Sequence, residues 1–225
     1  MSNHIVWLNL GYYTPMQLIL FGLGAVLWLV NYIFIVRNVI KNKFVEMPAA
    51  VLCANFTWEF LWAWIFMQNM GFAIGLGYKL WFCLDVFIVW GFYKYGYKQL
   101  DKTIIPYYKL LFTFAIIAWL AVLYFYIGQG LDNPIGANSA YVINILISSL
   151  YIFMFLRLED KSVLSFTTAW TKGAGTGFIS LMCILRWPEN RWLISMCIAC
   201  FLMDMFYIYL FLQYKKHSTH TKMIE

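Results

Sequence analysis

Seven long apolar runs alternate with short polar segments along the chain. The runs cover approximately residues 15–36, 47–68, 74–94, 105–127, 138–157, 164–185 and 190–214. A helix of about 20 apolar residues is long enough to cross a bilayer, so each run predicts one transmembrane helix. We therefore expect an all-α bundle of seven transmembrane helices, in which residues 1–225 form one integral membrane domain.

The composition agrees with a membrane protein. Hydrophobic residues make up 63% of the 225 residues, aromatic residues 21% and charged residues only 12%, about half the charged fraction of a soluble domain. The net charge of +6 does not indicate nucleic-acid binding, because the basic residues lie in short loops between apolar runs. The N-terminus lacks the pattern of a removable signal peptide.

The basic residues predict how the bundle is oriented. Twelve of the 16 Lys and Arg residues fall on one side of the predicted helices, three fall on the other, and Lys172 falls inside a run. The positive-inside rule then places the C-terminus in the cytoplasm and the N-terminus outside. The frequent Ile, Lys and Asn residues are more typical of a bacterial inner membrane protein than of a fungal protein of the endoplasmic reticulum.

Four ionisable side chains lie within the apolar runs: Glu59, Asp85, Lys172 and Asp204. A charge at the centre of a transmembrane helix costs at least about 2.5–3.5 kcal/mol, so each one suggests a function. By helical rise, Glu59 lies roughly 15 Å and Asp204 roughly 20 Å from the outer ends of their helices. We therefore expect both carboxyl groups to face one cavity.

Helical spacing predicts the neighbours of the two acids. Residues three, four or seven positions away share a face of a helix. These neighbours are Asn55, Trp62 and Phe66 beside Glu59, and Phe201 and Tyr207 beside Asp204. Apolar surroundings and a second carboxyl group both favour a protonated acid, which can act as a general acid.

Asp85 and Lys172 have simpler interpretations. Taken alone, Asp85 is more typical of a hydrogen-bonded contact between helices than of a catalytic site. For Lys172 we expect snorkelling or pairing with an acid. The glycine-rich run 172–177 resembles a phosphate-binding loop only in composition, and within a helix it predicts close packing against a neighbour.

Several kinds of site are absent from the sequence. The three histidines, His4, His217 and His220, are terminal, so we expect no metal or haem site in the bundle. No aspartate-rich cluster is present to hold magnesium and a diphosphate. The five cysteines all lie in apolar runs, where they are expected to be packing residues. We therefore expect no cofactor.

Two short stretches resemble a known family. The sequence Asn55-Phe56-Thr57-Trp58-Glu59, together with Asp204 in the last apolar run, resembles the membrane-bound terpene cyclases of fungal meroterpenoid and indole-diterpene biosynthesis. The resemblance implies a metal-independent cyclase of the isomerase or lyase type, with Glu59 and Asp204 as its acids. It implies a polyprenyl substrate with an aromatic or other head group, usually carrying a terminal epoxide. It assigns nothing to Asp85 or Lys172.

The chemistry of the residues is compatible with this function. A neutral carboxylic acid in a dry pocket can protonate an epoxide oxygen or an alkene, and aromatic rings can stabilise the resulting cation. The candidate substrate-binding residues are Asn55, Trp58, Trp62, Phe66, Asp85, Phe201 and Tyr207. The alternatives are a proton-coupled transporter that uses the buried acids as a relay, and a receptor without chemistry. The terminating base and the oligomeric state stay open.

Overall fold

The computed structural model describes residues 5–224, and within this range it contains helices and no strand. The seven α-helices are α1 Pro15–Asn42, α2 Ala49–Phe60, α3 Phe72–Tyr95, α4 Tyr108–Gly128, α5 Ala137–Arg157, α6 Phe166–Arg186 and α7 Arg191–Ile224. Three short helical segments are η1 Leu61–Ile65, η2 Gly96–Gln99 and η3 Lys161–Val163. The predicted all-α architecture with seven helices is confirmed.

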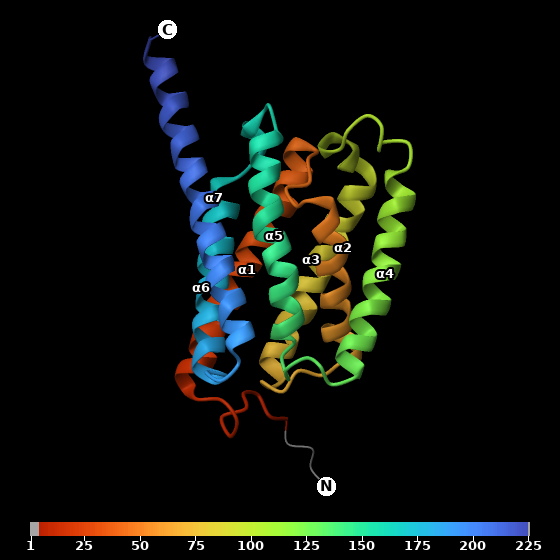
Figure 1. Cartoon of the computed structure of the whole chain (residues 1–225), viewed down its shortest axis with the longest axis vertical. Helices are drawn as coiled ribbons and strands as arrows, with labels where there is room; N and C mark the ends of the chain where they lie inside the picture. The colour runs from red at the N-terminus through yellow and green to blue at the C-terminus, as the bar shows by residue number, and fades with distance from the viewer. Residues whose placement is uncertain (1–4, 225) are drawn as a thin grey trace.

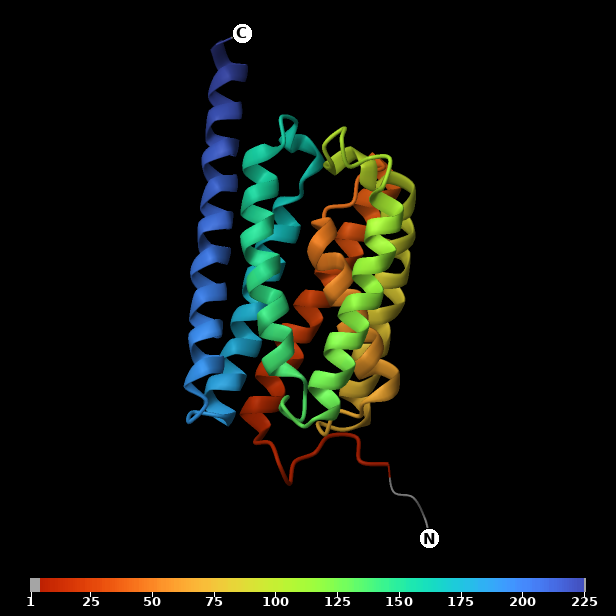
Figure 2. The same ribbon diagram turned by 45° about the vertical axis from the view of Figure 1, so that its right-hand side comes forward.

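The helices run alternately up and down in one bundle, and the two ends of the chain lie at opposite ends of it (Figure 1). α2 contacts α3, α4 and α5, whereas α7 packs against α5 and α6 on the other side of the bundle. Figure 2 shows this separation, with α7 at one edge and α3 and α4 at the opposite edge. α2 and α7 are therefore on different sides of α5.

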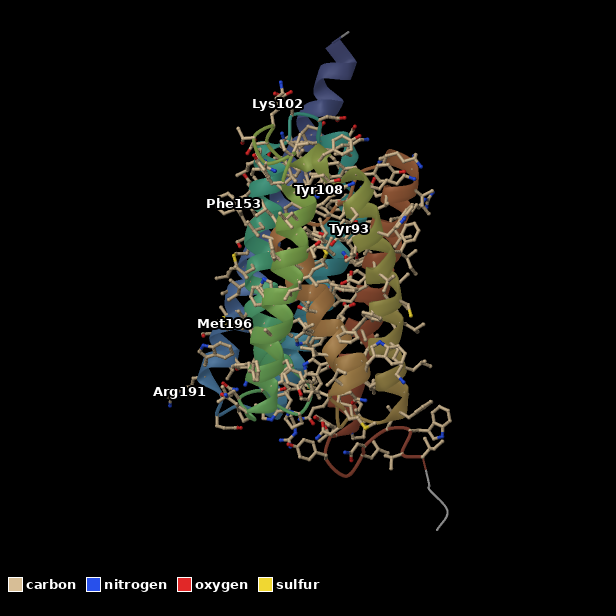
Figure 3. All side chains as sticks on the ribbon, turned by 90° about the vertical axis from the view of Figure 1, so that its right-hand side faces the viewer. Tyr93, Lys102, Tyr108, Phe153, Arg191 and Met196 are labelled. Carbon is tan, nitrogen blue, oxygen red and sulfur yellow. The ribbon has the colours of Figure 1, made fainter. Side chains whose placement is uncertain are left out.

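The bundle has a hydrophobic core that also contains buried polar side chains, and many apolar side chains lie exposed on its outer surface. Five of the helices in the described range are long and apolar enough to cross a membrane, namely Pro15–Asn42, Phe72–Gln99, Tyr108–Gly128, Ala137–Arg157 and Arg191–Lys216. Ala49–Ile65 is a shorter apolar helix. Outward-facing side chains such as Phe153 project away from the bundle (Figure 3), as a lipid environment allows. The chain is a multi-pass membrane protein.

Small residues let α1 and α6 approach closely. A Cβ atom on Gly24 would lie 2.8 Å from the carbonyl oxygen of Gly175, and one on Gly175 would lie 2.9 Å from Trp28. The expectation that the glycine-rich run allows close helix packing is thus confirmed. This contact places α6 against the side of α1 that carries Trp28.

α2 changes its geometry directly after Glu59. The chain continues from Phe60 into the π-helical segment Leu61–Ile65 and leaves the helical conformation at Phe66. A π-helical turn holds more residues than an α-helical turn, so it rotates the residues that follow. Positions beyond Phe60 therefore do not keep the face that α-helical spacing predicts for them.

Helix boundaries differ most where polar residues continue a helix. α1 runs to Asn42 instead of residue 36, and Lys43 ends it in a left-handed conformation. Inside α1, Asn38 remains buried by donating to Glu46. Lys102 and Arg191 lie at opposite ends of the bundle (Figure 3), while the direction in which the bundle crosses the membrane stays a prediction.

Candidate active site

A small cavity of about 90 Å³ lies within the bundle. It is smaller than a typical small-molecule pocket of roughly 300–1,000 Å³, so a prenylated ligand would need its wall to move apart. Its lining comes from five helices and one loop: Phe21, Trp28, Tyr32, Asn55, Trp58, Glu59, Tyr78, Trp81, Ile135, Ala137, Ala140, Tyr141, Ile143, Asn144, Ile147, Thr176 and Ile179. The wall is mainly apolar and aromatic.

The aromatic residues of the wall are held by their polar ends. Trp58 Nε1 donates to the Gly136 carbonyl at 3.2 Å and to Ser139 Oγ at 2.9 Å. The Tyr78 hydroxyl donates to the Ile135 carbonyl at 2.9 Å. These hydrogen bonds hold the rings at their polar edges and leave the ring faces free to line the cavity.

Glu59 belongs to a cluster formed by three helices. The Tyr32 hydroxyl of α1 donates to Glu59 Oε1. Asn55 Nδ2, one turn before Glu59 on α2, lies 3.1 Å from the same oxygen and 2.7 Å from the Tyr32 hydroxyl oxygen. It also donates to Asp85 Oδ2 of α3 at 2.7 Å. The neighbouring positions of Asn55 and Glu59 on one helix face, predicted from their spacing, are confirmed.

Three buried oxygens around this cluster accept no hydrogen bond from the protein: Glu59 Oε2, Asp85 Oδ1 and Asn144 Oδ1. Glu59 and Asn144 line the cavity, whereas Asp85 lies behind them and is fully buried. A buried acceptor without a donor is costly, so such atoms mark places where a ligand or a proton would be accommodated.

Asp204 has different surroundings. Its carboxyl group forms an ion pair of 2.5 Å with Lys172 of α6, whose ammonium group also donates to Ser148 of α5 at 2.8 Å. The predicted pairing of Lys172 with an acid is confirmed. Asp204 does not line the cavity, so the expectation that both acids face one cavity is wrong. Spacing along a helix gives depth, but packing between helices decides which way a side chain faces.

The residues predicted after Glu59 lie away from the cavity wall. Trp62 is buried against Gly136, whose φ of 76° and contact with this indole both require glycine. Phe66 contacts Trp62 and Tyr124. Neither Trp62 nor Phe66 lines the cavity. The π-helical segment explains the difference, because it rotates both residues off the face that carries Glu59.

The aromatic residues predicted beside Asp204 are also separate from the cavity. Phe201 is 47% exposed and lines a second cavity, of about 630 Å³, between α6 and α7. Tyr207 is buried and packs against Tyr151 and Phe211. Their roles in substrate binding stay predictions, whereas Asn55, Trp58 and Glu59 are the predicted residues that line the cavity.

Sequence reasoning missed several residues of the wall. Tyr32 and Asn144 lie in apolar runs and reach the cavity, and Thr176 accepts from Asn144 Nδ2 at 3.3 Å. The neighbouring polar pair Asn31-Tyr32 inside the first run was a usable signal, because polar residues in a transmembrane helix tend to face the interior.

Glu46 is another buried acid that sequence reasoning missed. It lies in the loop between α1 and α2, away from the cavity, and accepts hydrogen bonds from Asn38, Thr168 and the backbone of Ser165. Burial raises the pKa of this carboxyl group to about 8, although the three donors act in the opposite direction. Glu46 therefore joins the ends of α1 and α6.

Among the described residues, no group of three or more His, Cys, Asp or Glu side chains is placed to hold a metal ion. His4 lies outside the described residues.

Comparisons with known proteins identify similar chains. A family model described as Pyr4-like transmembrane terpene cyclases matches residues 11–217. The Pyr4-family terpene cyclase mfmH of Annulohypoxylon moriforme is 25% identical over 80% of this chain and 76% of its own length. The terpene cyclase macJ of Penicillium terrestre is 23% identical over 76% of this chain and 67% of its own length.

A shorter match links 38% of the chain to the terpene cyclase spyD of Aspergillus fumigatus. No solved structure matches the chain. These relatives are fungal, so they do not support the preference for a bacterial inner membrane over the endoplasmic reticulum.

Proposed function

Because the chain belongs to the Pyr4-like transmembrane terpene cyclases, we propose that it cyclises a polyprenylated substrate with an aromatic head group by acid initiation. One observation carries the proposal. Glu59 Oε2 is a buried carboxyl oxygen that has no hydrogen-bond partner and belongs to a residue on the wall of an aromatic cavity. A carboxylic acid in that position has a proton to give and no protein acceptor that competes for it on the cavity side.

The proposed reaction conserves the atoms of the substrate. Glu59 gives its proton to a terminal epoxide oxygen or to an alkene carbon. With an epoxide, an oxygen lone pair forms the new O–H bond, and the C–O bond breaks with its electron pair staying on the oxygen. With an alkene, the π electron pair forms the new C–H bond. The cation is then attacked by the next alkene, and each attack forms one C–C bond. Loss of a proton ends the sequence and replaces the proton that Glu59 gave.

The cavity wall is suited to a cationic reaction. Trp28, Trp58 and Trp81 line it, and each cation–π contact stabilises a cation by about 0.5–2 kcal/mol. An apolar wall also excludes water, which would otherwise capture the cation. The fixed orientation of Trp58 favours one folded shape of the prenyl chain.

Asp204 takes a different place in this proposal. The resemblance gives it an acid role, which stays a prediction. Its ion pair with Lys172 supports a role behind the wall, because Lys172 is one turn from Thr176 and its partner Ser148 is one turn from Asn144. Asp204 would then hold α5 and α6 in place around the substrate.

The experiment uses membranes that contain the full chain. They are incubated with farnesyl and geranylgeranyl phenols, each in a plain and a terminally epoxidised form. We expect at least one compound to give a product of unchanged mass and new retention time. EDTA should leave the rate unchanged, because the proposed reaction uses no metal.

Two variants make this experiment specific. Glu59→Gln should abolish conversion, whereas Glu159→Gln, which changes an exposed glutamate after α5, should convert the substrate like the wild type. No conversion of any of the four compounds would reject the proposed substrate class. Equal conversion by Glu59→Gln would reject Glu59 as the acid. No observation favours the proton-coupled transporter.

A further inference from the structure

Asn55 connects Glu59 to a second carboxyl group that does not reach the substrate. Its Nδ2 atom lies 3.1 Å from Glu59 Oε1 and 2.7 Å from Asp85 Oδ2. Asp85 lies on α3, is 0% exposed and is not part of the cavity wall. The two carboxyl groups therefore bind the same amide nitrogen. Asp85 is therefore placed to act on Glu59.

The hydrogen bonds of the two acids follow a complementary pattern. Each carboxyl group has one oxygen with donors, Glu59 Oε1 and Asp85 Oδ2, and one oxygen with none, Glu59 Oε2 and Asp85 Oδ1. Two ionised carboxylates at this distance would repel each other and leave two buried acceptors unpaired. One proton on the pair removes the repulsion and leaves one unpaired acceptor fewer.

The surrounding groups offer no positive charge to replace that proton. The polar side chains that share the cavity wall with Glu59 from the other helices are neutral: Tyr32 of α1, Tyr78 of α3, Tyr141 and Asn144 of α5, and Thr176 of α6. Asn55, the side chain that donates to Asp85, is also neutral. The ammonium group of Lys172 is bound to Asp204.

We propose that Glu59 and Asp85 together hold one proton, that this proton lies on Glu59 Oε2, and that Asp85 is a positioning residue that keeps Glu59 protonated for the reaction. This inference rests on the proposed function of the same cavity. When substrate enters, the O–H bond at Glu59 Oε2 breaks and its electron pair stays on the carboxylate. Tyr32 and Asn55 stabilise the resulting charge by hydrogen bonds, and the proton released at the end of the cyclisation returns to the pair.

The first test is the pH dependence of turnover by the full chain in membranes. Asp85→Asn keeps an acceptor for Asn55 but removes the neighbouring negative charge, so Glu59 should lose its proton more readily. We expect the alkaline fall in activity to move at least one pH unit lower, with activity at low pH within a few-fold of wild type. Asp85→Glu should return the fall toward its wild-type position.

A matched control separates this effect from a general loss of charge. Asp101→Asn changes an exposed aspartate in the loop between α3 and α4 and should leave the pH profile unchanged. An Asp85→Asn profile that coincides with the wild-type profile, in a protein recovered at normal yield, would show a purely structural role and overturn the proposal.

The second test needs no substrate. Infrared spectra of the purified full chain should contain the carbonyl band of a protonated carboxylic acid that disappears in Glu59→Gln. This band should change position in Asp85→Asn, or in Asp85→Glu if the amide variant cannot be recovered. If the band has the same position in every Asp85 variant, the proposal that the two acids share a proton is overturned. A band that depends on Asp85 supports it even where no test compound is converted, so the two proposals can fail separately.

Discussion

Glu59 and Asp204, two of the buried acids, have different hydrogen-bond partners. Asp204 has an ammonium group at 2.5 Å, so its negative charge is balanced inside the bundle. Glu59 has a phenol, an amide and a second carboxyl group around it, and none of them carries a positive charge. An apolar environment disfavours the charged form of a carboxyl group, whereas a nearby cation favours it.

This difference supports a chemical role for Glu59 and a structural role for Asp204. A protonated acid on a cavity wall can give its proton to a substrate, whereas we propose that the Lys172–Asp204 ion pair holds α6 and α7 together. Both acids looked alike in the sequence, because each is a single carboxyl group in an apolar run. The comparison therefore shows that the partner of a membrane carboxylate is more informative than its depth.

We expect the largest effect on turnover, and it should differ between variants of Glu59 and variants of Asp204. Glu59→Gln should lower turnover by about 10²–10⁴-fold, the usual contribution of a general acid. The double variant Lys172→Met/Asp204→Asn removes a charge pair without leaving an unpaired charge and should lose less than about tenfold. Product formation in membranes at equal protein levels measures both. A double variant as inactive as Glu59→Gln would restore Asp204 to the chemistry.

Stability should show the opposite order. Lys172→Met leaves the Asp204 carboxylate buried without its cation, which should destabilise the protein by about 3–5 kcal/mol. Adding Asp204→Asn should recover most of that loss. Denaturation of the detergent-solubilised protein gives the free energies of unfolding. If the single and double variants were equally unstable, the ion pair would not be what holds α6 and α7 together.

A smaller effect should appear where α1 meets α6, the helix that contributes to both sites. Gly24→Ala places a methyl group 2.8 Å from the Gly175 carbonyl oxygen, and such overpacking should cost about 1–3 kcal/mol. Gly22→Ala is the matched control, because its methyl group meets no atom within 4 Å. Because α6 also carries Thr176, turnover should fall in the Gly24 variant alone. Equal melting temperatures for both variants would contradict the close helix contact.

Glu46 extends the comparison to an acid outside the helices. Its pKa of about 8, compared with an ordinary 4.5, means that the folded protein binds a proton that the unfolded chain has lost between these values. Stability should therefore fall as pH rises through this range, by at most about 1.4 kcal/mol per pH unit. Melting temperatures across the range measure the slope, and Glu46→Gln should flatten it. A wild-type protein that gains stability over the same range would contradict this assignment.

The sequence predicted the architecture because membrane helices depend on length and apolarity, which are local properties. It also predicted that Asn55 and Glu59 are neighbours, since four residues separate them on one helix. It could not predict that Asp85 is the acid beside Glu59, because that contact depends on how α2 packs against α3.

Other errors came from local geometry that the residue pattern does not reveal. Trp62 and Phe66 were assigned to the face of Glu59 by assuming a continuous α-helix. The residues Leu61–Ile65 form π-helical turns instead. Tyr32 was overlooked because a tyrosine in an apolar run is usually interpreted as bulk, although here it donates to Glu59.

The π-helical segment at Leu61–Ile65 has a consequence for how such a protein can diverge. It sets the rotation of the residues that follow α2 relative to the part of α2 that carries Glu59. Removing one residue from it would turn the following side chains by about 100° while Glu59 kept its place. The residues after Phe60 can therefore vary between related proteins without moving Glu59, the proposed acid.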